Sequence, residues 1–235
     1  DGNIDILNFG LDSQNQFLAK FKLYSSSYNS ESGDFSTIEL SESFSSVLRL
    51  FSPSFDIGDF DNDQDIDVVI SGDLIFGGYI TKIFENTTET GTNNFLFEEF
   101  TEAQLPGISD GSTDFIDFDS DGDLDLLISG FYDVGNKVFS MHENVGESQW
   151  PAIETILPEM SDTQLDFGDF NADGFSDLLI SGIDNNDNYV TLLMEYEPGV
   201  GFIESDYDLS EFSNAKFAFG DLDGDTDLDF VIAGT

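Results

Sequence analysis

The chain alternates between short hydrophobic runs and polar turns, and no segment keeps the 3.6-residue period of an amphipathic helix. Uninterrupted apolar triplets, such as Leu126–Ile128 and Leu178–Ile180, predict strands that are buried on both faces. A short alternating run precedes each triplet. A Ser-Gly or Ala-Gly turn follows it and leads into a further alternating run. The pattern therefore predicts an all-β chain built from repeated units.

Each repeated unit is expected to hold four short strands. The strands that flank the apolar triplets are expected at 54–60, 79–85, 95–100, 114–118, 137–143, 152–156, 164–170, 189–196, 201–207 and 216–222. Four strands in roughly 55 residues are typical of a propeller blade. A parallel β-helix, whose coils are usually shorter, is the alternative. No linker or composition shift divides the chain, so residues 1–235 are expected to form one repeat array.

The repeats are visible directly in the sequence. Four segments align without gaps: GDFDNDQDIDVVISG at 58–72, IDFDSDGDLDLLISG at 116–130, GDFNADGFSDLLISG at 168–182, and GDLDGDTDLDFVIAG at 220–234. Residues 1–10 match the second half of the same motif, with Asp5 in the place of Asp67. The chain therefore contains four complete copies and one partial copy.

The charge of the chain is very unbalanced. Its 235 residues include 49 acidic and 6 basic ones, which gives a formal net charge of −43. Such a charge opposes collapse, but 39% of the residues are hydrophobic and 25 are Phe, enough to build a core. We therefore expect a folded chain whose negative charge is partly neutralised by something bound to it.

The composition also excludes several classes of partner and site. Nucleic acids and anionic membranes bind basic patches, which six scattered Lys and Arg residues cannot form. No run approaches 18 apolar residues, so no membrane insertion is expected. Without Cys there are no disulfides, thiolate zinc sites or Cys nucleophiles. The chain has no initiator Met and no signal-like N-terminus, so it is expected to begin downstream of the natural start.

The repeated acidic segment has the chemistry of a hard-cation site. In the second copy, carboxylates occupy positions 1, 3, 5, 7 and 9 of the nine residues that begin at Asp117. Ca²⁺ takes six to eight oxygen ligands, whereas Mg²⁺ prefers fewer protein ligands. An EF-hand is excluded, because position 12 is Ile in every copy instead of the bidentate Glu. Solvated acidic turns are the alternative, but four gap-free copies favour calcium.

We expect side-chain ligands at positions 1, 3, 5 and 9 and a backbone carbonyl at position 7, where one copy has Phe175. The expected metal-binding residues are Asp59, Asp61, Asp63, Asp65, Asp67, Asp117, Asp119, Asp121, Asp123, Asp125, Asp169, Asn171, Asp173, Phe175, Asp177, Asp221, Asp223, Asp225, Asp227 and Asp229. Gly122 and Gly174 permit a sharp bend at position 6. Gln64 and Thr226 occupy that position in the other copies, where more strain or an altered geometry is expected.

On these residues the chain resembles the FG-GAP/VCBS repeat family, the calcium-loop β-propellers found in integrin α-subunits and many secreted bacterial proteins. The resemblance rests on D-x-[DN]-x-D-x-x-x-D before an apolar strand, with Phe-Gly-Asp at 167–169 and 219–221. It implies one structural Ca²⁺ in the hairpin between the first two strands of each blade, about four ions in all. It also implies an extracellular or cell-surface location. The partial copy, with only Asp1 and Asp5, is expected to hold an ion poorly.

Counting strands gives the expected architecture. The chain offers strands two to four of one blade, three full blades, and strands one and two of a last blade. The rings of the resembling family have six to eight blades, so we expect about four blades of a larger propeller. Its open edges would contact the rest of the ring or other chains. An independently closed ring is the alternative.

The function expected from these features is a secreted or cell-surface, calcium-stabilised binding or adhesion module whose ligand is a glycan or a protein. The alternatives are a propeller polysaccharide lyase or hydrolase, or part of one, and a non-catalytic scaffold in a surface complex. No catalytic motif is present, and the sole His, His142, is expected to be structural or on the surface. We therefore expect no enzyme.

Partner contacts are expected in the variable segments that follow the Ser-Gly turns, at 73–78, 131–136 and 183–188. Ordinary turns explain this variability equally well. Trp150 is either a stacking platform for a sugar or an ordinary strand aromatic, and Asn86-Thr-Thr88 fits a glycosylation sequon.

Overall fold

The computed structural model describes residues 6–12, 15–29, 34–39, 44, 50–89, 95–146, 149–153, 157–207, 209, 212, 215–224 and 228–235. For residues 6–39 it describes the backbone alone. The regular structure in these ranges is entirely β, as the sequence predicts. None of it is a helix long and apolar enough to cross a bilayer.

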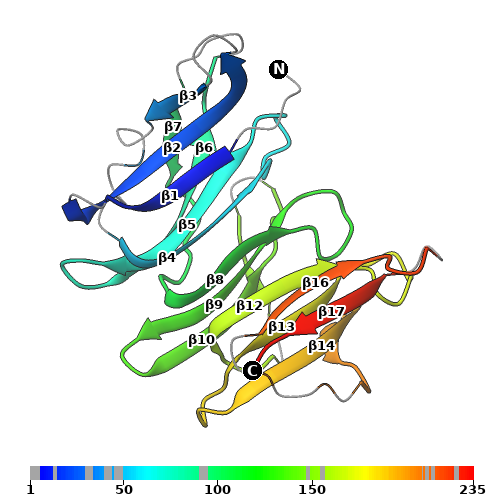
Figure 1. Cartoon of the computed structure of the whole chain (residues 1–235). Helices are drawn as coiled ribbons and strands as arrows, with labels where there is room; N and C mark the ends of the chain where they lie inside the picture. The colour runs from blue at the N-terminus through cyan, green and yellow to red at the C-terminus, as the bar shows by residue number, and fades with distance from the viewer. Residues whose placement is uncertain are drawn as a thin grey trace.

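The described strands form five antiparallel sheets, which follow one another in chain order and which we call blades 1 to 5 (Figure 1). Blade 1 contains β1 (Ile6–Asp12), β2 (Asn15–Asn29) and β3 (Asp34–Glu39). Blade 2 contains β4 (Leu50–Gly58), β5 (Asp67–Leu74), β6 (Tyr79–Asn86) and β7 (Phe97–Phe100). Blade 3 contains β8 (Ser109–Ile116), β9 (Asp125–Asp133), β10 (Asn136–His142) and β11 (Ala152–Ile153). Blade 4 contains β12 (Ser161–Gly168), β13 (Asp177–Ile183), β14 (Tyr189–Glu197) and β15 (Gly201–Glu204), and blade 5 contains β16 (Lys216–Gly220) and β17 (Asp229–Ala233).

Strands that are consecutive in the sequence pair with each other inside every blade, so each blade is a meander. The numbers of strands in the described sheets are three, four, four, four and two, which confirms the expected partition of the chain. Antiparallel meanders are the form of a propeller blade, whereas the coils of a parallel β-helix pair in parallel. In the described part of the chain, no strand of blade 1 pairs with one of blade 5, so the sheets form an open series.

The first strands of blades 2, 3 and 4 begin several residues earlier than the hydrophobic pattern predicts. The cause is a bulge near the start of each one, where the pairing register shifts between Phe51 and Ser54, between Ser109 and Ser112, and between Ser161 and Gln164. Ser52, Asp110 and Asp162 lie inside these bulges with φ of 43°, 47° and 51°. A bulge breaks the two-residue alternation, which conceals the start of the strand in the sequence.

The hydrophobic core lies between consecutive blades, and the second strand of each blade contributes to both of its faces. In β9, Leu127 packs in a cluster with Leu178 of blade 4. Its neighbours Leu126 and Ile128 pack on the other face in a cluster with Phe60 of blade 2. The uninterrupted apolar triplets are therefore strands buried on both faces, as predicted.

The first strands β4, β8, β12 and β16 are neighbours in succession, so adjacent blades are joined along this row (Figure 1). Two aspartates accept hydrogen bonds from the neighbouring first strand of the next blade. Asp56 Oδ2 accepts the N–H of Phe115 at 2.9 Å, and Asp166 Oδ2 accepts the N–H of Phe219 at 2.9 Å. These bonds run from one blade to the next and hold the spacing between blades.

The residue before an acidic loop lies against position 8 of the next loop in two places, and the sizes of the side chains at the equivalent positions alternate along the chain. The three pairs of equivalent positions are Gly58 with Leu124, Ile116 with Ser176, and Gly168 with Leu228. A Cβ added to Gly58 would lie 2.5 Å from Leu124 Cδ1, and one added to Gly168 would lie 2.8 Å from Leu228 Cδ1. Leucine therefore fills the space that glycine leaves, and the middle pair reverses the two sizes.

Asp114 in β8 gives the fold a specific pH dependence. Its carboxylate accepts a hydrogen bond from Ser112 Oγ at 2.5 Å, while burial, with a further contribution from Asp56, raises its pKa to about 7. The folded chain thus holds this proton more tightly than the unfolded chain does. The corresponding stability is present at acidic pH and is lost as the pH rises towards and through 7.

Asp114→Asn is therefore expected to stabilise the chain more at pH 8 than at pH 5, by about 2 kcal/mol, because the amide stays neutral. Urea unfolding at the two pH values, with calcium in excess so that the loop carboxylates keep their ion, measures the difference. An effect of equal size at both pH values would contradict the role given to Asp114.

Candidate metal centres

Each nine-residue acidic segment forms the hairpin between the first and second strands of its blade and ends on the first residue of the second strand. We number its positions from the first Asp and call the segments loop 1 (59–67), loop 2 (117–125), loop 3 (169–177) and loop 4 (221–229). They join β4 to β5, β8 to β9, β12 to β13 and β16 to β17. Residues 225–227 of loop 4 lie outside the described residues.

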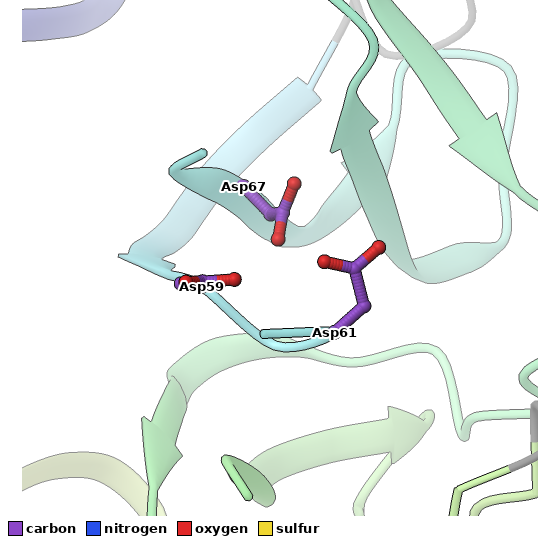
Figure 2. Close-up of side chains that lie close together, drawn as sticks. All are labelled: Asp59, Asp61 and Asp67. Carbon is purple, nitrogen blue, oxygen red and sulfur yellow. The ribbon is translucent and has the colours of Figure 1, made fainter. Parts of the chain in front are cut away.

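Carboxylates at positions 1, 3 and 9 converge in loops 1, 2 and 4. In loop 1, Asp59, Asp61 and Asp67 each offer one oxygen, and these oxygens all lie within 4.8 Å of one another. Figure 2 shows the three side chains pointing towards a common space inside the hairpin. The equivalent groups are Asp117, Asp119 and Asp125 in loop 2, and Asp221, Asp223 and Asp229 in loop 4. Three separate groups of carboxylates could thus each hold one ion.

The position 9 aspartate is buried in loops 1, 2 and 3, whereas Asp229 of loop 4 is half-buried. The exposed fractions of Asp67, Asp125 and Asp177 are 1%, 1% and 0%. In loop 2, Asp125 Oδ2 accepts the N–H of Phe118 at 3.3 Å and Oδ1 accepts the N–H of Asn144 at 2.8 Å. Loops 1 and 3 repeat both bonds. This carboxylate therefore links the loop to the end of the third strand of its blade.

The carboxylates at positions 1, 3 and 5 accept hydrogen bonds from backbone N–H groups of their own loop. In loop 2, Asp117 accepts the N–H groups of Asp121 at 3.1 Å and Gly122 at 3.1 Å. Asp119 accepts the N–H of Asp121 at 3.2 Å, and Asp121 accepts the N–H of Asp123 at 2.9 Å. Loops 1 and 3 have the same bonds, with the Asn171 amide oxygen at position 3 of loop 3. The backbone donors thus hold the carboxylates in place.

The turn requires left-handed backbone at two positions. Position 6 has φ of 95° at both Gly122 and Gly174 and 77° at Gln64, and position 4 is left-handed as well, for example at Asn62 with φ of 61°. Loop 1 thus keeps the glycine geometry although it has no glycine there. The expected strain at Gln64 follows from this, because an L-residue in that region is disfavoured. Thr226 lies outside the described residues.

Gln64→Gly is expected to stabilise the chain by about 1 kcal/mol, because glycine adopts the left-handed turn without steric cost. The variant should also raise calcium affinity at loop 1, since the turn is then closer to that of loop 2. Chemical denaturation with and without calcium measures the first effect, and calorimetric titration the second. A destabilised variant would show that the Gln64 side chain makes a favourable contact that outweighs the strain.

The electrostatics of the loops favour a bound cation. Burial, the largest cause, raises the pKa of Asp67 and of Asp125 to about 7, and in each case the acidic residues at positions 3 and 5 add to the shift. The pKa of Asp61 is raised too, by partial burial and by its neighbours Asp63 and Asp59. No Lys or Arg occurs in any of the four loops. A divalent ion among these oxygens would supply the missing positive charge.

The converging atoms are all oxygens, the ligand type that Ca²⁺ accepts in sets of six to eight. Positions 1, 3 and 9 are brought together, whereas the position 5 carboxylates of loops 1 to 3 point one oxygen at the N–H of position 7 and are not part of the close groups. Their role as ligands stays a prediction. Asp225 and Asp227 lie outside the described residues, as do Asp1 and Asp5 of the partial copy.

The side chains at position 7 make contacts of their own. The ring centroids of Phe175 and Tyr196 lie 5.6 Å apart, and Asp123 Oδ1 accepts a hydrogen bond from Asn62 Nδ2. Asp65, the equivalent residue of loop 1, donates its N–H to Asp63. An aromatic contact at this position is compatible with a ligand supplied by the backbone carbonyl, which also stays a prediction.

The only His and the only Trp of the chain are buried side chains outside the close groups of carboxylates. His142 is buried, with Nδ1 3.2 Å from the carbonyl oxygen of Trp150 and Nε2 3.2 Å from Ser140 Oγ. Burial lowers its pKa. Trp150 is 8% exposed and packs near Phe60, with ring centroids 5.9 Å apart. Its ring therefore belongs to the core and is not an open stacking platform.

Sequence reasoning missed an asparagine that supports the acidic loops of blades 2 and 3. Asn144 lies 19 residues after Asp125, two residues beyond the end of β10, and its Nδ2 donates to the carbonyl oxygens of Phe60 at 2.8 Å and Leu124 at 3.2 Å. Asn86 has the equivalent place in blade 2. The signal in the sequence was an Asn in a Glu-Asn pair at the same distance from two of the acidic segments.

Comparison with protein-family models identifies one repeat directly. Residues 117–180 match the FG-GAP-like repeat, a span that runs from the first Asp of loop 2 to the end of the apolar triplet in β13. The chain thus contains an FG-GAP-like repeat, and its acidic groups are typical of the calcium sites in such repeats. No curated protein matches the chain significantly.

Proposed function

We propose that this chain is a calcium-stabilised propeller module that binds a glycan or protein ligand in a secreted or cell-surface protein. The observation that carries the proposal is the converging set of carboxylates at positions 1, 3 and 9 in loops that contain no basic residue, with the position 9 member almost fully buried in loops 1 and 2. Each such set needs a counter-ion, and its all-oxygen chemistry favours Ca²⁺.

A calorimetric calcium titration of the purified chain tests the metal assignment. Binding of about four ions is expected, with Asp169, Asn171 and Asp177 of loop 3 forming a weaker site because the amide carries no charge. Mg²⁺ at the same concentration serves as the control and should bind more weakly, because it holds its own waters. Heat of binding with Mg²⁺ but none with Ca²⁺ would overturn the assignment.

An extracellular setting is favoured by the affinity expected for such sites. Exposed loops of this type in extracellular modules bind calcium with Kd of roughly 10⁻⁴ to 10⁻³ M. They would fill at extracellular calcium levels and stay largely empty in a cytosol. Four bound ions would change the net charge from −43 to −35, which leaves the surface acidic and self-repelling.

The end of the blades opposite the metal loops is the surface best suited to a ligand. A cavity of about 450 Å³ lies there between the bulged starts of β4, β8 and β12. Its lining includes Asp110, Asp162, Gln164 and Tyr189, which offer carboxylate, amide and hydroxyl groups to a hydroxyl-rich ligand.

The turns between the second and third strands reach the same end. Phe76, in one of the variable segments, is 86% exposed, and Val134, in the next, is 89% exposed. Large apolar side chains at such exposure, on turns that differ between repeats, favour contact with a partner.

Binding to a glycan array and to extracellular-matrix proteins, in calcium, tests the ligand assignment. Phe76→Ser with Val134→Ser should weaken binding, whereas Val200→Ser should not. Val200 is also exposed but lies in the β14–β15 turn, at the end of the blade that carries the metal loops. An equal loss of binding in the double variant and in Val200→Ser, or no loss in either, would place the ligand elsewhere.

One observation favours a second candidate, a glycoside hydrolase. Asp110 and Asp162 line the same cavity, and Asp162 has a pKa raised by burial and by the charge of Asp110. Hydrolases of this class use two carboxylates of unequal pKa. Release of reducing ends from polysaccharides, lost in Asp162→Asn, would support this candidate, and no release would leave the binding module as the function.

A further inference from the structure

Neighbouring metal loops are joined by the side chain at position 4. Asn62 of loop 1 donates from Nδ2 to Asp123 Oδ1 of loop 2 at 2.6 Å, and its distance to the Gly122 carbonyl oxygen is 3.4 Å. Ser120 of loop 2 donates from Oγ to the Gly174 carbonyl oxygen of loop 3 at 2.9 Å. The first link reaches positions 6 and 7 of the next loop, and the second reaches position 6.

These links reach the part of the receiving loop that shapes its site. Gly122 has left-handed backbone, and its N–H binds Asp117 at position 1. The N–H of Asp123 binds Asp121 at position 5. Holding positions 6 and 7 therefore also holds the carboxylates that converge on the ion and the carbonyl predicted as a ligand.

A second link joins loops 1 and 2 through Asn144. Its Nδ2 binds the Phe60 carbonyl oxygen in loop 1, while its N–H binds Asp125 in loop 2. The N–H of Phe60 in turn binds Asp67 at 3.1 Å. One asparagine therefore connects the two buried position 9 carboxylates.

The links become fewer along the chain. Loops 1 and 2 share two, and loops 2 and 3 share the Ser120 bond. Loops 2 and 3 have no second link, because the residue equivalent to Asn144 in blade 4 is Tyr196, whose side chain has no amide. Position 4 of loop 3 is Ala172, whose methyl group cannot donate a hydrogen bond to loop 4. Loop 4 therefore lacks the position 4 link and serves as the comparison.

We propose that Asn62, Ser120 and Asn144 are positioning residues that couple calcium binding between neighbouring loops, so that loops 1 to 3 fill cooperatively and loop 4 fills independently. The proposal rests on the calcium binding proposed above. An ion fixes the turn of its own loop, and the link passes part of that ordering to the next loop, which then loses less freedom when its ion binds. The coupling is reciprocal.

Calcium titration of ¹⁵N-glycine-labelled chain by NMR tests the proposal, because Gly122, Gly174 and Gly224 report on loops 2, 3 and 4 separately. Disabling loop 1 with Asp59→Asn and Asp61→Asn should weaken calcium binding at Gly122 by about five- to twenty-fold. Asn62→Ala removes one of the two links between these loops, so it should cause part of this loss by itself and little further loss in the disabled chain. Gly224 should keep its midpoint throughout.

Asn62→Ser is the rescue variant, because serine makes this link at position 4 of loop 2, and it should restore binding at Gly122. Asn186→Ala, in the exposed turn at the far end of blade 4, is the matched control and should change no midpoint. Midpoints at Gly122 that agree within about two-fold in all variants would overturn the coupling while leaving calcium binding intact. Equal losses at Gly122 and Gly224 would overturn it as well, since they indicate general destabilisation. Glycine signals that do not shift when calcium is added would overturn both proposals.

Discussion

Removal of calcium is expected to lower the melting temperature of this chain by at least about 12 °C. At calcium concentrations ten to a hundred times Kd, each occupied site adds about 1.4 to 2.7 kcal/mol to the free energy of unfolding. Four sites together then add about 6 kcal/mol or more, and each kcal/mol shifts the melting temperature of a chain of this size by about 2 to 4 °C. The carboxylates that lose the ion also repel one another, which adds to the effect.

Differential scanning calorimetry in calcium and in EDTA measures the shift. Magnesium in place of calcium is the matched control, because it supplies the same charge and screening with a poorer fit to the loops. High concentrations of sodium chloride separate general screening from specific binding. A melting temperature that is the same in calcium and EDTA would remove the basis of the proposed function.

The second large effect is expected at position 9. Asp125→Ala should destabilise the chain by about 2 to 4 kcal/mol even in EDTA, because it leaves the buried N–H groups of Phe118 and Asn144 without their acceptor. Relief of repulsion from Asp119 and Asp121 offsets a part of this loss. In calcium the variant also loses the ion of loop 2, so its deficit should grow.

Asp119→Ala is the matched comparison. It removes another carboxylate of the same group, but the one N–H that Asp119 accepts, from Asp121, is also bound by Asp117. Its effect in EDTA should stay below about 1 kcal/mol, while its loss in calcium should approach that of one bound ion. Urea unfolding with and without calcium separates the two variants. Equal losses in EDTA would show that the position 9 bonds do not hold the blade together.

Much of the fold could be predicted from the sequence because each blade repeats a strong local signal. The triplet at Leu126–Ile128 is buried on both faces, and only a strand between two sheets needs such a run. The gap-free acidic segments fixed the hairpins between first and second strands. The strand count of each described sheet followed from the spacing of the copies.

What the sequence did not reveal depends on contacts between blades or on backbone geometry. The bulges at Ser52, Asp110 and Asp162 interrupt the alternation on which strand prediction relies. The division of the carboxylates, with positions 1, 3 and 9 together and position 5 turned to an N–H, follows from the left-handed turn. The bond from Asn62 to Asp123 joins residues that become neighbours only when two blades pack.

The alternation of glycine with leucine and of isoleucine with serine between blades has a further consequence. Although the repeats share one motif, they are not interchangeable: if blades 3 and 4 exchanged places, the first strand that ends in Ile116 would meet Leu228, and the first strand that ends in Gly58 would meet Ser176. The first encounter overfills the interface, and the second leaves a void. Each repeat thus recognises its own successor, which protects a chain of similar units against pairing with the wrong neighbour while it folds.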